Sequence, residues 1–72
     1  MNVDEMIDTF RRVLETEDIG ADTDFFEAGG DSLLATRILS AIAKHSGVEL
    51  TFDDFVVSPT PNALAKQLGS AK

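Results

Sequence analysis

The sequence predicts an all-α fold, a small four-helix bundle with a long loop between helices 1 and 2 and a short third helix. Apolar residues near the start of the chain recur at the three- and four-residue spacing of one helix face, not in strand alternation. A stretch without any period follows, and it contains turn-forming glycines. The chain has 72 residues and no cysteine, so we expect one domain, residues 1–72, with a simple core and no disulfide framework.

The first helix is expected over residues 3–15. Its apolar positions form a single stripe along one face: Val3, Met6, Ile7, Phe10, Val13 and Leu14. Such a stripe needs a partner surface, so this helix should pack against the rest of the bundle.

A long loop is expected from Thr16 to Asp31. Turn-forming residues replace the helical period there: Gly20, Asp22, Thr23, Asp24, Gly29 and Gly30. Loops of this length in compact domains are usually functional or disordered. We expect the apolar residues Ile19, Phe25 and Phe26 to hold this one in place by packing into the core.

A second helix should begin at about Ser32, because Asp31 or Ser32 can accept a hydrogen bond from an unpaired backbone N–H of the first turn. It should end at Lys44 or Ser46, before Gly47. Its expected buried stripe is Leu34, Ile38, Ala41 and Ile42.

Two further helices complete the bundle. A short third helix is indicated by Phe52, Phe55 and Val56, and it should stop before Pro59. Thr60 followed by Pro61 is typical of a helix cap with proline at the first helical position. The last helix should then continue through Ala63, Leu64, Ala65 and Leu68, and Gly69 should end it.

Charge and composition exclude several classes of function. The net charge of −7 argues against binding to nucleic acid, which requires a basic face. No apolar run is long enough to span a membrane, and the acidic start Met1–Glu5 is unlike a secretory signal, so we expect a cytoplasmic protein. Residues 1–31 hold ten of the acidic residues. Most of these should form a solvated face, and a field that steers basic partners is the alternative.

The segment Gly29–Ala35 places Ser32 where a glycine turn meets a helix. An ordinary helix cap is the simplest interpretation of this segment taken alone. A nucleotide site is disfavoured because the Walker lysine and a preceding strand are missing. A calcium loop is disfavoured because Phe26 and Glu27 stand where an oxygen ligand and a glycine are needed, so no metal site is expected.

A serine hydrolase is also disfavoured. The single histidine, His45, follows Ser32 by thirteen residues on the same expected helix, which places it about 20 Å away. It cannot act as general base for Ser32 within one chain. His45 is expected to be a solvated or partly packed residue near the helix end.

Residues 24–37 resemble the core motif of phosphopantetheine carrier proteins, closest to the peptidyl carrier domains of nonribosomal peptide synthetases. Later landmarks of this family match at appropriate spacing: Gly47–Val48, Leu50, Phe55, Pro59–Thr60, Leu64–Ala65 and Leu68. Ala28 departs from the family pattern, in which a larger aliphatic residue is common. The resemblance is close over residues 24–68, whereas the first helix matches only as an amphipathic pattern.

The resemblance implies a four-helix bundle of acyl-carrier type in which Ser32 carries a covalent 4'-phosphopantetheine arm, derived from coenzyme A. Gly30 and Asp31 would belong to the same cofactor-binding site. A helix N-terminus favours a negative phosphodiester. The glycines would leave room for a modifying enzyme, and Asp31 would act as a cap or contact that enzyme.

A recognition face is expected on the outer side of the second helix. It comprises Leu33, Thr36, Arg37 and Ser40. The helix carries two bases, Arg37 and Lys44, and no acid, whereas fatty-acid carriers typically have acids there. The sequence therefore favours the peptide-synthetase branch, and the alternative is that Arg37 and Lys44 are merely solvated.

The resemblance implies a non-catalytic carrier that holds aminoacyl or peptidyl groups as thioesters in nonribosomal peptide or related biosynthesis. A phosphopantetheinyl transferase would attach the arm with coenzyme A and magnesium, and an adenylating enzyme would load it. Condensation, tailoring or thioesterase enzymes are further expected partners of a monomeric, free-standing protein. Two alternatives stay open: an acyl carrier for polyketide or other acyl groups, and a helical interaction module that never receives an arm.

Overall fold

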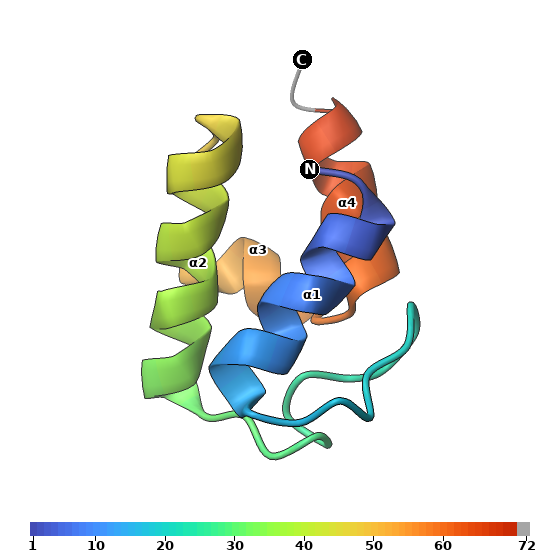
Figure 1. Cartoon of the computed structure of the whole chain (residues 1–72). Helices are drawn as coiled ribbons and strands as arrows, with labels where there is room; N and C mark the ends of the chain where they lie inside the picture. Colours follow the sequence, from blue (N-terminus) through green and yellow to red (C-terminus); the bar gives the residue numbers. More distant parts are fainter. Residues whose placement is uncertain (71–72) are drawn as a thin grey trace.

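The computed structural model describes residues 1–70, and the predicted all-α, four-helix fold is confirmed there (Figure 1). The helices are α1 (Val3–Leu14), α2 (Ser32–Ser46), α3 (Phe52–Val57) and α4 (Pro61–Ser70). α1 packs against both α2 and α4, and the short α3 packs against α2. No helix within residues 1–70 has the length and hydropathy needed to cross a membrane.

α1 begins at a reciprocal cap. The Asn2 side chain accepts a hydrogen bond from the Glu5 backbone N–H at 2.8 Å, and the Glu5 carboxylate accepts one from the Asn2 N–H at 3.1 Å. The helix ends at Glu15, which adopts a left-handed conformation with φ of 55°. The observed bounds therefore agree with the expected ones to within one residue.

Three phenylalanines form the centre of the core. Phe10 of α1, Phe25 of the loop and Phe55 of α3 are all fully buried. Phe25 meets Phe10 and Phe55 edge to face, with ring centroids 5.4 and 5.0 Å apart. The core thus joins the loop to two helices that are distant in sequence.

The loop between α1 and α2 is held against the bundle, as predicted. Ile19 and Phe25 are buried, whereas Phe26 remains 37% exposed and rests edge-on against Phe25. Backbone hydrogen bonds also tie the loop to the start of α4: Phe25 N–H donates to Pro59 O at 2.8 Å, and Asn62 N–H donates to Ala21 O at 2.9 Å. The loop therefore has a defined path to the start of α2.

Two details of the expected helices are corrected. In α2 the fully buried residues are Ala35, Ile38 and Ile42, while Leu34 and Ala41 are only half-buried. Compared with the expected orientation, α2 is rotated about its axis so that the small side chain of Ala35 lies in the core. In α4 the helix does not end at Gly69 but continues to Ser70, because Gly69 does not adopt the left-handed conformation that Gly47 adopts at the end of α2.

Candidate functional site at the start of α2

Ser32 is the first residue of α2 and is exposed to solvent. It lies at the end of the bundle opposite the amino terminus and the last turn of α4 (Figure 1). The long loop leads directly into it. An enzyme can therefore approach this serine from the loop end of the molecule.

Asp31 is the cap of α2, which confirms one of its two expected roles. Its Oδ1 accepts a hydrogen bond from the Leu34 backbone N–H at 2.9 Å, and its carbonyl accepts one from Ala35 at 2.9 Å. The N–H groups of Ser32 and Leu33 have no partner among residues 1–70, and the first turn of α2 contains no acidic residue. The start of the helix thus fits a negatively charged group on Ser32.

The two glycines before the site serve different structural purposes. Gly29 adopts a φ of +104°, a conformation that other residues rarely reach. Gly30 lies directly on the ring of Phe25, and a Cβ added there would come within 2.7 Å of Phe25 Cζ. The space beside Gly30 is therefore filled by a core side chain, so this glycine allows Phe25 to pack against the backbone just before Ser32.

Gly30→Ala is expected to destabilise the protein by about 1–3 kcal/mol, because the new methyl group forces the buried Phe25 ring to move. Gly20→Ala is the matched control, since a Cβ there meets only Thr23 Oγ1 at an ordinary 3.7 Å. Chemical denaturation of both variants measures the difference. Equal midpoints for the two alanine variants would contradict the close contact between Gly30 and Phe25.

The expected recognition residues lie on one exposed side of α2. Leu33 is 66% exposed, and Thr36, Arg37 and Ser40 are exposed as well. Thr36 Oγ1 donates a hydrogen bond to the Ser32 carbonyl at 3.0 Å, which ties its side chain to the first turn. The exposure of Leu33, which the helical spacing predicted, is thus confirmed.

Four other apolar side chains are exposed, which corrects the expectation that Phe26 packs into the core. They are Phe26, Phe52, Val56 and Val57. α3 has six residues and buries only Phe55, so its remaining apolar residues face outward. The shortness of the third apolar segment could have indicated these exposed side chains, because a helix of six residues can bury little of its surface.

His45 lies far from Ser32, at the other end of α2. Its Nε2 is 3.0 Å from Glu5 Oε2, and its side chain is half exposed. The pKa of the Glu5 carboxyl is held below its ordinary value, chiefly by the hydrogen bond from the Asn2 N–H and additionally by His45. Within residues 1–70 no three His, Cys, Asp or Glu residues are grouped as a metal site.

Comparison with known proteins agrees with this geometry. Residues 4–68 match the family described as "Phosphopantetheine attachment site". The chain belongs to this family. Its prosthetic group is covalent 4'-phosphopantetheine from coenzyme A.

The carrier chain resembles segments of large synthetases. It is 46% identical over 59 residues to a probable non-canonical nonribosomal peptide synthetase, CymA, of Salinispora arenicola, which covers 82% of the chain. It is 37% identical over 68 residues, or 94% of the chain, to surfactin synthase subunit 1 of Bacillus subtilis. The chain spans only 1% and 2% of the length of these two relatives.

Solved carrier structures have the same fold. One is the complex of the phosphopantetheine transferase Sfp with coenzyme A and a peptidyl carrier protein, with a TM-score of 0.93 and 27% identity over 97% of this chain and 91% of that one. Another is the solution structure of an active-site mutant peptidyl carrier protein, with a TM-score of 0.92 and 28% identity over 96% of this chain and 77% of that one. The chain is thus a carrier domain homologous to peptidyl carrier domains of nonribosomal peptide synthetases, as its motif indicates.

Proposed function

We propose that this carrier domain holds aminoacyl or peptidyl groups on a 4'-phosphopantetheine arm attached to Ser32 Oγ. The observation that supports this most directly is the position of Ser32, which is exposed at the amino end of a long helix. The chain also belongs to the family of phosphopantetheine attachment sites. Residues 1–72 would form one independently folding domain. Gly30 and Asp31 would support the arm by placing Ser32 and capping its helix.

The residues of the chain bind and present the arm and carry out no chemistry themselves. The N–H groups of Ser32 and Leu33 would stabilise the phosphodiester, while the Asp31 carboxylate is turned towards Leu34. When bound, the arm supplies the thiol for a thioester, a group that this cysteine-free chain lacks. A phosphopantetheinyl transferase, with coenzyme A and magnesium, and a loading enzyme would therefore provide the catalytic groups.

Intact-protein mass spectrometry tests the assignment. Incubation with coenzyme A, magnesium and the transferase Sfp should add the mass of one phosphopantetheine group, and peptide mapping should place it on Ser32. Adenylating enzymes should then load amino acids in preference to malonyl groups. No mass increase, or a modification on another residue, would show that Ser32 is not the attachment site.

The exposed side of α2 is proposed to be recognised by these enzymes through Leu33, Thr36, Arg37 and Ser40. Leu33→Ala should slow arm attachment or loading about tenfold, as expected for an apolar residue at the centre of an interface. Its stability should change by less than about 0.5 kcal/mol, because Leu33 is 66% exposed. A variant that melts several degrees lower but reacts normally would place Leu33 in the core.

A further inference from the structure

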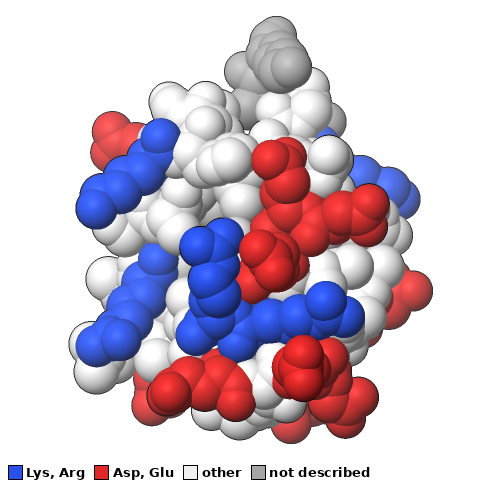
Figure 2. All heavy atoms as spheres, viewed as in Figure 1, with Lys and Arg blue, Asp and Glu red and all other residues white. Residues whose placement is uncertain are grey.

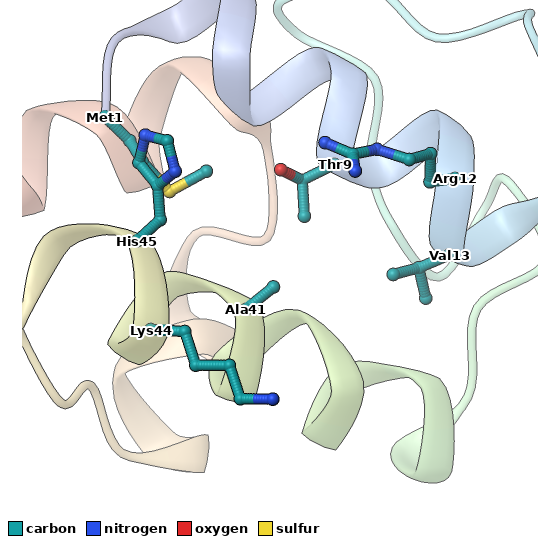
Figure 3. Close-up of a pocket in the computed structure, with 7 residues that line it drawn as sticks. All are labelled: Met1, Thr9, Arg12, Val13, Ala41, Lys44 and His45. Carbon is teal, nitrogen blue, oxygen red and sulfur yellow. The ribbon is translucent and has the colours of Figure 1, made fainter.

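A groove lies between α1 and α2, with a volume of about 370 Å³. Its floor includes Thr9, Val13 and Ala41, its rim includes Arg12, Lys44 and His45, and Met1 lies beside His45 at one end (Figure 3). We call it the α1–α2 groove. The floor presents methyl groups and the rim presents nitrogen donors, so the groove fits a ligand with both apolar and acidic parts.

The rim carries two basic side chains, Arg12 and Lys44, although the chain has a net charge of −7. No acidic residue of the described chain lines the groove, and α2 contains no Asp or Glu. Arg12 lies 3.3 Å from Asp8, and His45 Nε2 lies 3.0 Å from Glu5 Oε2. Two of the three rim side chains therefore already meet carboxylates of α1, whereas Lys44 has no carboxylate within 4.0 Å among residues 1–70. Figure 2 shows Lys and Arg side chains gathered over α1 and α2, with acidic side chains around them. Lys44 is therefore the rim side chain that can attract an acidic group of a partner, while the acidic side chains around the rim repel such a group and so orient its approach.

The groove continues the side of α2 that carries Leu33. Lys44 follows Leu33 by eleven residues and Arg37 by seven, about three and two helical turns, so all three lie in one row. Lys44 is about 18 Å along the helix from Ser32. A protein interface of ordinary size, about 800 Å² on each partner, covers both Ser32 and the groove.

The exposure of the rim favours a protein segment over a small anion. The side chains of Arg12 and His45 are 76% and 53% exposed, and exposed ion pairs contribute little individually. A small anion would obtain its binding free energy only from such exposed ion pairs. A protein segment also places an apolar side chain on the floor and brings several carboxylates to the rim together.

We propose that the α1–α2 groove docks an acidic segment of an enzyme that acts on the arm. Carboxylates of this segment lie beside Arg12 and Lys44, and one small apolar side chain lies on the floor near Ala41. The inference rests on the proposed function, because the partner is defined as an enzyme that works at Ser32.

The probe for this surface is a capped peptide of alternating Glu and Leu, added to the ¹⁵N-labelled chain at low salt. Amide shifts should be largest at Thr9, Val13, Ala41 and Lys44, and they should disappear at high salt. Lys44→Glu should weaken binding about tenfold, which corresponds to one reversed charge near the surface. The matched control is Lys66→Glu, an exposed residue of α4, which should bind as the wild type does.

Three results would overturn the proposal: largest shifts outside the groove, equal weakening by Lys66→Glu and Lys44→Glu, or the same shifts with free glutamate at the same concentration. The last result would make the groove a small-anion site. Binding is measured before arm attachment, and arm attachment is scored separately by mass spectrometry. Loss of peptide binding with normal modification of Ser32 thus contradicts only the docking site, whereas a failure of modification contradicts the proposed function.

Discussion

Ser32→Ala is expected to leave the helices folded and to abolish attachment of the arm. Alanine cannot form the phosphodiester, because the variant lacks the hydroxyl oxygen. The fold should tolerate the change because the cap is provided by Asp31, and the Ser32 side chain makes no hydrogen bond to another residue within 1–70. The stability change should stay within about 0.5 kcal/mol.

The control for this variant is Ser40→Ala, which removes another exposed serine of α2. It should accept the arm at the wild-type rate, since Ser32 is the only serine that follows paired glycines at a helix start. Circular dichroism compares the folds, and mass spectrometry after incubation with coenzyme A and Sfp compares the modification. Arm transfer to Ser32→Ala at the wild-type rate would show that another residue is the attachment site.

Phe25→Ala is expected to leave the protein largely unfolded. Phe25 is fully buried and contacts Phe10, Phe55 and the backbone of Gly30. Truncating a buried phenylalanine costs about 3–5 kcal/mol. A single core of this size provides about 3–5 kcal/mol of stability in total, so the loss is comparable to the whole.

Phe26→Ala is the matched comparison, because this neighbouring ring remains 37% exposed although it meets Phe25 and Phe55 edge to face. Removing the Phe26 ring should lower the free energy of unfolding clearly less than removing the Phe25 ring. Thermal and urea denaturation of the two variants measures the difference. If Phe25→Ala is as stable as the wild type, the loop does not depend on this ring for its position.

The helices and their ends could be predicted because local chemistry specifies them. The α1 stripe, the Asp31 cap, Gly47 and the Thr60–Pro61 start each act within one or two turns of the chain. Ser32 and its exposed neighbour Leu33 were placed correctly for the same reason. The end of α4 was not predicted correctly, since Gly69 does not adopt the left-handed conformation with which Gly47 ends α2.

The sequence by itself determined the all-α fold, the order of the helices and the position of Ser32 at a helix start, because these follow from spacing and capping along a short stretch of chain. Only the tertiary structure decided which distant residues meet: that Phe25 fills the space beside Gly30, and that Arg12 of α1 and Lys44 of α2 line the same groove. Such contacts join residues that are distant in sequence. They depend on how the helices pack, and no local pattern contains that information.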